Sequence, residues 1–217
     1  MDITKEEYVR YVAEPKHLIN PVRDIILFDT PFLEMFSKTP WYHIPIFWLP
    51  WAVYFMLENT LTVGATLWYI FLGIFLWSFI EYFLHRFLFH SEDHLPDNKF
   101  VFLFHFLLHG IHHAFPQDPL RLVFPIILGY SILLTLILPL FNNVFPEELC
   151  PTLKTGVIFG YIGYDLTHYF IHHSSPKEGY FKFVKMYHMA HHYRDGEAGF
   201  GVSQKFWDII FRTELDL

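Results

Sequence analysis

The sequence predicts an all-α integral membrane protein, with four transmembrane helices and a cytosolic helical cap in a single domain, residues 1–217. Three observations predict this class. Hydrophobic residues make up 53% of the chain, and aromatic residues make up 21%. Charged residues make up only 17%, against about a quarter in soluble domains. Finally, four long apolar stretches with almost no charge alternate with polar segments.

Bulk composition also excludes several classes of function. The net charge is −7 with neutral histidines, so no basic surface for nucleic acid is expected. Cys150 is the one cysteine, which excludes an intramolecular disulfide and a thiolate metal cluster. The first residues, MDITKEEYVRYVAEP, are charged and lack the apolar core of a secretory signal, so we expect no cleaved signal peptide.

The chain divides into an N-terminal segment, four spans and two cap segments. Residues 1–40 are expected to form short cytosolic or interfacial helices, because prolines interrupt them repeatedly. The expected spans are approximately residues 41–58, 61–82, 123–141 and 155–173. The first is short for the roughly 20 residues that a spanning helix needs. The cytosolic cap then comprises residues 83–122 and 174–217.

Charge distribution supports this topology. Four spans place both chain ends and both cap segments on one side of the membrane. Apart from Lys154, every lysine and arginine falls on that side. Lysine and arginine are enriched in cytoplasmic segments of membrane proteins. The cap is therefore expected to be cytosolic.

Histidines are concentrated in the cap and at the adjoining helix ends. The chain has 15 histidines, and most lie in the motifs HRFLFH, HFLLHGIHH, HYFIHH and YHMAHH. Residues three and four apart share one face of a helix, so each motif can present several imidazoles to one place. His85 and His90 are five apart, which suits a helix end or a slightly unwound turn. The candidate metal ligands are His85, His90, His109, His112, His113, His168, His172, His188, His191 and His192.

The number of imidazoles indicates two metal ions that share one site. Neutral imidazole binds iron, zinc, copper and nickel, and one ion takes about four to six ligands. The motifs hold few carboxylates and no H-E-x-x-H, which would place a glutamate base beside zinc. Oxygen chemistry at a redox metal therefore fits better than a membrane zinc hydrolase. A metal transporter would place its ligands near the middle of the membrane, whereas these lie at helix ends.

The histidine motifs resemble a known family. HRFLFH, HGIHH, DLTHYFIHH and YHMAHHYRDGEAGFGVSQKFWDIIF resemble the histidine boxes of the fatty acid hydroxylase / sterol desaturase superfamily. Within it, RLVFP, YDLTHY and the pair Trp207–Asp208 after GFG resemble the fatty acid 2-hydroxylases of sphingolipid synthesis. The resemblance implies an endoplasmic reticulum membrane protein with two metal ions, iron in the working enzyme and zinc in some purified samples. It also implies O2-dependent hydroxylation of C2 in very-long-chain acyl groups, free or in ceramide.

The resemblance also assigns residues. The ten histidines named above match the ligand positions of the boxes. Tyr164 and Asp165 resemble a tyrosine–aspartate pair near the substrate path; the alternative is a satisfied polar pair near a helix end. His105 and His173 fall outside the ligand spacing, so hydrogen-bonding roles are expected for them. Asp208 is expected either to orient a ligand histidine or to cap a helix.

One family feature is missing from the sequence. Many relatives carry an N-terminal cytochrome b5 domain with a haem-binding H-P-G-G, and this chain has no such motif. Electrons are then expected from a separate cytochrome b5 and its reductase, unless the chain is a fragment. The nearest alternative activities are those of a desaturase or a sterol hydroxylase with similar boxes, and product analysis would separate them.

Overall fold

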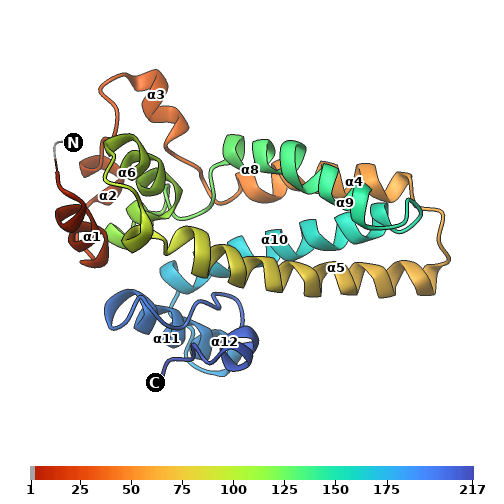
Figure 1. Cartoon of the computed structure of the whole chain (residues 1–217). Helices are drawn as coiled ribbons and strands as arrows, with labels where there is room; N and C mark the ends of the chain where they lie inside the picture. Colours follow the sequence, from red (N-terminus) through yellow and green to blue (C-terminus); the bar gives the residue numbers. More distant parts are fainter. Residues whose placement is uncertain (1–2) are drawn as a thin grey trace.

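The computed structural model describes residues 3–217, so residues 1 and 2 of the expected N-terminal segment lie outside the described residues. The described chain is all-helical, without a strand among these residues. Long helices form an extended bundle, and shorter helices form a cap at one end of it (Figure 1). Helices α1 and α12, near the two ends of the chain, both lie at the cap end.

Four helical rods build the bundle. They are α4 (His43–Leu57), α5 (Val63–Leu84), the continuous rod α8–η4–α9 (Ile126–Ile132, Leu133–Ile137 and Leu138–Val144), and α10 (Cys150–His173). These rods lie on the four expected stretches, with shifted ends. Helix α10 begins five residues before the expected start, with Pro151 in its first turn. Proline is tolerated there because the first N–H groups of a helix make no hydrogen bond within the helix.

Two of these rods are long and apolar enough to cross a membrane by length and composition. They are Val63–Phe89, of 27 residues, and Ile126–Val144, of 19 residues. Helix α4 is apolar but has only 15 residues. The first rod exposes large apolar side chains along its length, including Leu67, Trp68 and Phe71. The structure therefore gives two candidate membrane spans and an apolar outer surface suited to lipid.

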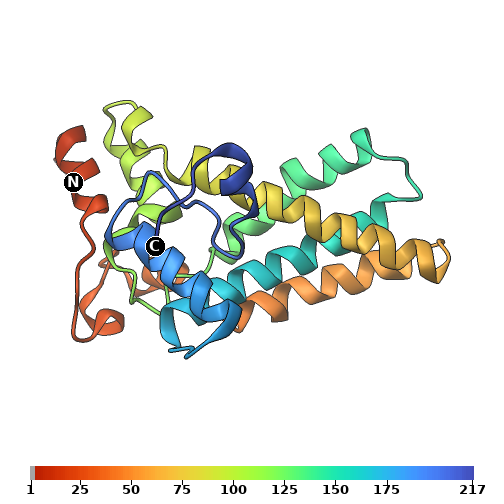
Figure 2. The same cartoon turned by 90° about the horizontal axis from the view of Figure 1, so that it is seen from below.

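Helix α10 lies between α4 and α5 and packs against both (Figure 2). Two glycines set its distance from α5. A Cβ on Gly73 would lie 2.4 Å from the Leu153 carbonyl oxygen, and a Cβ on Gly156 would lie 2.2 Å from the Ile70 carbonyl oxygen. Small residues allow this backbone-to-backbone approach, which is common between membrane helices.

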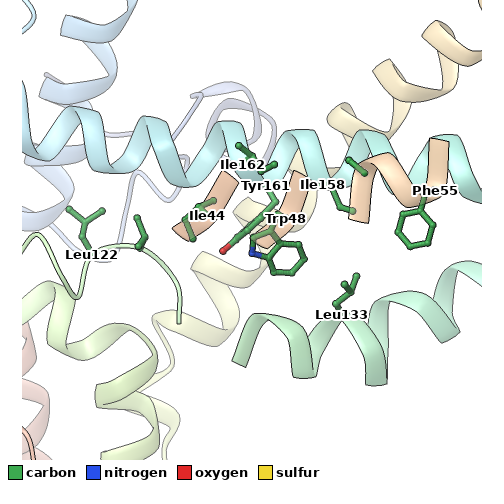
Figure 3. Close-up of a cluster of buried hydrophobic side chains, with 10 residues drawn as sticks. Ile44, Trp48, Phe55, Leu122, Leu133, Ile158, Tyr161 and Ile162 are labelled. Atoms are coloured by element: carbon green, nitrogen blue, oxygen red, sulfur yellow. The ribbon is translucent and has the colours of Figure 1, made fainter. Parts of the chain in front are cut away.

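The apolar core of the bundle lies on the other face of α10. Ile44 and Trp48 of α4 meet Tyr161 of α10 there, and Leu133 of η4 closes the cluster (Figure 3). The rings of Trp48 and Tyr161 have centroids 4.7 Å apart. This packing fixes the depth and rotation of α10, whose last turns carry histidines into the cap.

The cap is assembled from short helices that are distant in sequence. Its elements are α1 (Lys5–Ala13), α2 (Pro21–Asp24), α3 (Pro31–Phe36), η1 (His85–Phe89), η2 (Glu92–His94), α6 (Lys99–His105), η3 (Phe106–Gly110), α7 (Ile111–Ala114), α11 (Gly179–Tyr193) and α12 (Phe206–Phe211). Pro21 and Pro31 begin helices, because proline is accommodated at a first helical position.

A buried ion-pair network attaches α3 to the cap. Arg121 pairs with Glu34, and its Nη1 also donates to Asp118 Oδ2 at 2.7 Å. The second Glu34 oxygen, Oε2, accepts the backbone N–H groups of Leu27 and Phe28 at 2.9 and 3.1 Å. Glu34 thus holds the chain ahead of α3 against the cap.

Candidate metal centre

The first histidine motif forms a π-helical turn. Helix α5 continues into η1, where the His90 N–H donates to the His85 carbonyl at 3.1 Å. This bond joins residues five apart, as in a π-helix. The five-residue spacing therefore places His85 and His90 on one face, with ring centroids 4.9 Å apart. A widened turn, inside an otherwise regular helix, accounts for the unusual spacing.

Two groups of imidazoles form within the cap. Cluster A contains His85, His90, His109 and His113, whose ring nitrogens lie within 4.8 Å of one another. His191 adjoins this group, since its Nε2 lies 3.0 Å from His90 Nε2, and we count it in cluster A. The Nε2 atoms of His85 and His109 are 3.2 Å apart. Cluster A therefore brings together five of the ten expected ligands.

Cluster B contains the other five: His112, His168, His172, His188 and His192. The Nε2 of His188 lies 2.9 Å from that of His168, 2.9 Å from that of His172 and 3.0 Å from that of His192. The ring of His112 lies 4.5 Å, centroid to centroid, from those of His168 and His192. All five residues are buried.

Neighbouring residues on one helix serve different clusters. In α7, His113 belongs to cluster A and His112 to cluster B; in α11, His191 belongs to A and His192 to B. Successive residues on an α-helix point about 100° apart, so a helix wedged between two clusters reaches both. The clusters adjoin at His113 and His192, whose ring centroids are 4.2 Å apart.

The donor set fits metal ions. Both clusters offer imidazole nitrogens, and neither contains a carboxylate. Two nitrogens about 2.1 Å from a shared ion, at about 90°, lie about 3.0 Å apart, which matches the Nε2 separations here. Buried Nε2 atoms of His112 and His113 also lack a hydrogen-bond partner within the described chain. These clusters are able to bind metal ions.

Burial keeps the imidazoles of His109, His113 and His191 neutral. Desolvation lowers the pKa of His109 and of His113 well below the ordinary histidine value, and neighbouring imidazoles lower both further. Desolvation, with His90 nearby, lowers the pKa of His191 to about 3. A neutral imidazole keeps the lone pair that a metal ion requires. The site is therefore ready for a cation near neutral pH.

Backbone carbonyls fix the tautomers of two cluster A histidines. His85 Nδ1 donates to the Phe200 carbonyl at 2.5 Å, and His191 Nδ1 donates to the Ala198 carbonyl at 2.7 Å. A carbonyl oxygen can only accept a hydrogen bond, so each Nδ1 carries the proton. The lone pair is then on Nε2, which faces the cluster.

The histidines outside the expected ligand set have other roles. His105 Nε2 donates to the Phe89 carbonyl at 2.8 Å, and its Nδ1 accepts from the Tyr8 hydroxyl at 2.6 Å. Both of its nitrogens are thus engaged with protein, and it supports the end of η1. His173 is exposed beside the Tyr169 ring, and His94 is exposed in η2.

Tyr164 and Asp165 line a cavity that reaches the clusters. The cavity has a volume of about 340 Å³, and His109, His112 and His168 form part of its wall. Asp165 is buried, and its Oδ2 accepts the Phe124 N–H at 3.3 Å. Most of the remaining wall is apolar side chains from the N-terminal segment, α8 and the cap.

A second, smaller cavity adjoins the first within the bundle. Its volume is about 100 Å³, and its walls are almost entirely apolar. Phe89, Phe124 and Tyr164 line both cavities. The space beside the imidazoles therefore continues between apolar helices, which suits a long hydrocarbon chain.

Glu81 was missed by reasoning from sequence. It is buried at the cap end of α5, and its carboxylate accepts two backbone N–H groups from residues 202 and 203. A carboxylate at the end of a long apolar helix was the available signal, since ionisable groups are costly there.

Comparison with known proteins places this architecture in a family. The family model for fatty acid hydroxylases matches residues 70–213. The dihydroceramide fatty acyl 2-hydroxylase FAH2 of Arabidopsis thaliana is 38% identical over 96% of this chain and 86% of its own length. The ceramide very long chain fatty acid hydroxylase scs7 of Schizosaccharomyces pombe is 37% identical over 98% of this chain. The fatty acid 2-hydroxylase of Rattus norvegicus is 34% identical over 96% of it.

A solved structure agrees with the sequence comparison. The structure described as full-length scs7p, with only its hydroxylase domain visible, superimposes with a TM-score of 0.88 at 37% identity. It covers all of this chain, which in turn covers 81% of that chain. The present chain spans 61% of the fission yeast relative and 60% of the rat relative. The likeness therefore extends over the bundle and the cap together.

Proposed function

Because the chain belongs to the fatty acid hydroxylase family, we propose that it is a membrane di-iron oxygenase that hydroxylates C2 of very-long-chain fatty acyl groups, free or in ceramide, for sphingolipid synthesis. One observation carries the proposal: ten imidazoles, nine of them from buried residues, converge in two adjoining clusters, beside a cavity that continues between apolar helices. The names of the relatives, which include dihydroceramide, ceramide and fatty acid 2-hydroxylases, support the substrate class.

The two clusters would hold one ion each. When bound, iron supplies the redox chemistry that activates O2, which no amino-acid side chain can do. The protein's own part is to keep the imidazoles neutral, to aim their Nε2 atoms inward and to exclude bulk water. Burial of both clusters and the carbonyl contacts of His85 and His191 support each of these roles.

The cavity would bind the acyl group with C2 beside the clusters. Tyr164 and Asp165 are polar groups on the cavity wall, and the Tyr164 ring lies 5.8 Å from the His168 ring, so they would position the carboxyl or amide group next to C2. The hydrocarbon tail would extend past Phe124 toward the smaller cavity. Fixing both ends of the reacting segment favours attack at one carbon over its neighbours.

Membrane placement and electron supply complete the proposal. All four rods of the bundle would cross the endoplasmic reticulum membrane, with the cap and both termini in the cytosol. The excess of lysine and arginine at the cap end supports this orientation. Electrons would come from cytochrome b5 and its reductase.

The test combines metal content with product analysis. The protein is purified anaerobically from iron-replete cells, and 2-hydroxy acyl lipids are measured in the same cells by mass spectrometry. We expect iron in both clusters together with new 2-hydroxy lipids. Zinc in both, with no oxygenated lipid when cytochrome b5 and its reductase are supplied, would contradict the proposal and favour a zinc hydrolase. Hydroxylation or desaturation at another carbon would contradict the C2 assignment alone.

A further inference from the structure

The segment of residues 198–203, here called the GFG segment, lies behind cluster A. Its Ala198 and Phe200 carbonyls accept the Nδ1 protons of His191 and His85, as described above. These two histidines are distant in sequence, and one short loop orients both. The position of this loop therefore determines where two metal-facing lone pairs point.

Two buried carboxylates hold the GFG segment from its other side. Glu81 Oε1 accepts the N–H groups of Val202 and Ser203 at 3.1 and 2.8 Å, and Oε2 accepts the Ser203 hydroxyl at 2.6 Å. Asp208 Oδ1 accepts the Phe200 N–H at 2.9 Å, and its Oδ2 accepts the Gly201 N–H at 2.9 Å. Both side chains are at least 97% buried.

The backbone of the segment has little room to move. A Cβ on Gly201 would lie 1.9 Å from the Gln204 carbonyl oxygen and 2.7 Å from Asp208 Oδ2. Gly199 has φ of +72°, a left-handed conformation that favours glycine. Four of the six residues in the segment donate a backbone N–H to a buried carboxylate. Such a loop transmits the position of Glu81 and Asp208 to the carbonyls that face the histidines.

We propose that Glu81 and Asp208 are positioning residues for one metal ion, the ion of cluster A, and act on it through the GFG segment. The inference rests on the proposed function in that it requires metal-loaded clusters. The inference predicts that the two carboxylates affect the ion of cluster A and leave the ion of cluster B unaffected. Cluster B makes no hydrogen bond to the GFG segment, and the Nδ1 atoms of His112, His188 and His192 have no partner within the described chain.

The chemistry of the two carboxylates distinguishes their amide variants. In Glu81→Gln, the amide oxygen still accepts both backbone N–H groups, and the amide nitrogen donates to the Ser203 hydroxyl, which can reverse its direction. In Asp208→Asn, each side-chain position faces a backbone N–H, so the new NH2 group always meets a donor. We therefore expect the glutamine to be tolerated at 81 and the asparagine to disturb the segment.

The experiment counts zinc during a chelator titration of the whole chain in detergent micelles. Wild-type protein is loaded with zinc and dialysed against increasing EDTA. In Asp208→Asn and Glu81→Leu, we expect the first ion to leave at about 10- to 100-fold lower EDTA, as is typical when a hydrogen bond behind a ligand is lost. The second ion should leave at the wild-type concentration, and Glu81→Gln should match wild type throughout.

A matched control separates positioning from general loosening. Glu34→Leu also removes a buried carboxylate that accepts two backbone N–H groups, and it breaks the ion pair with Arg121 as well. None of its partners binds a cluster histidine. This variant should lower the melting temperature at least as much as Glu81→Leu and still release both ions at wild-type EDTA concentrations.

A His191→Ala background identifies the affected ion. This variant lacks a cluster A ligand, so the remaining ion belongs to cluster B and should not respond to Glu81→Leu. Release of both ions in parallel from Glu81→Leu, or unchanged release from Asp208→Asn, would overturn the inference. Wild-type protein that binds no zinc and no iron would instead overturn the proposed function.

Discussion

Clusters A and B contain equal numbers of imidazoles and differ in what lies behind the rings. In cluster A, His85 and His191 donate their outer protons to carbonyls of one loop. In cluster B, the outer nitrogens of His112, His188 and His192 have no partner within the part of the chain that the structure describes. In cluster B, the imidazole rings carried by α7, α10 and α11 instead pack directly against one another.

The difference teaches that two adjoining sites can depend on separate parts of one fold. The geometry of cluster A depends on a loop and on two carboxylates that hold it. The geometry of cluster B depends on how deeply α10 sits in the bundle, which the Gly73–Gly156 contact and the Trp48–Tyr161 core determine. Perturbations that reach one cluster and spare the other should therefore exist.

The largest expected effect comes from removing one ligand of each cluster. His191→Ala should lose the ion of cluster A, and His192→Ala should lose that of cluster B, although the residues are neighbours on α11. Hydroxylation should fall at least about 100-fold in both variants, because each removes a direct ligand. Metal analysis and assays of 2-hydroxy lipid check this. Full activity in either variant would contradict the role of that histidine as a metal ligand.

Acid should affect both clusters alike, because burial governs both. The pKa of His191 falls to about 3 on folding, from about 6.5 in an unfolded chain. The unfolded chain therefore binds more protons below pH 6.5. The stability contributed by the neutral ring is fully present above that pH and is lost as the pH falls toward 3, at about 1.4 kcal/mol per pH unit for such a histidine.

Thermal unfolding of metal-free protein between pH 7.5 and pH 5 measures this loss. We expect the melting temperature to fall progressively below pH 6.5, since burial also lowers the pKa of His188 and His192 in cluster B. The variants His191→Ala and His192→Ala should each flatten the curve by a similar amount. An unchanged melting temperature across this range would show that the rings are not buried in the neutral form.

A methyl group on the GFG segment should affect the ion of cluster A and leave the ion of cluster B unaffected. Gly201→Ala places a Cβ 1.9 Å from the Gln204 carbonyl oxygen, so the loop that orients His85 and His191 must shift. Overpacking of this kind costs about 1–3 kcal/mol. In the EDTA titration, one ion should be released more easily and the other should be unaffected. Gly163→Ala is the control, because its Cβ would meet no atom within 4 Å.

The smallest expected effect concerns His105, which supports η1 without facing an ion. Tyr8→Phe removes the hydroxyl that donates to His105 Nδ1 at 2.6 Å. We expect a loss of about 0.5–1.5 kcal/mol in the free energy of unfolding and no loss of metal. Denaturant titration and metal analysis check both expectations. Release of an ion from this variant would mean that His105 contributes to cluster A.

Much of the architecture follows from local sequence patterns. Charge-free stretches predict the bundle rods, because a long apolar segment must be covered by lipid or by other helices. Histidines three and four apart predict a shared face, because the period of the α-helix is local. The family boxes identify which histidines to expect at the site. Whether all four rods cross the membrane stays a prediction, since two of them meet the length and composition of a span.

Other features were decided by segments that meet only after folding. The sequence left two possible roles for Asp208 and assigned no role to Glu81. Asp208 and Glu81 both hold the GFG segment, because α12 packs on α5 through the stacked rings of Tyr82 and Phe211. Sequence spacing carries no information about that approach.

The sequence by itself determined a helical membrane protein with ten histidines spaced to bind metal. It did so because helix periodicity and apolar length act over a few turns of one segment. Only the tertiary structure decided that the ten divide into two clusters, with neighbours such as His191 and His192 on opposite sides. It also decided that the Phe200 carbonyl, more than a hundred residues away from His85, fixes the tautomer of His85, since such contacts depend on how separate helices pack.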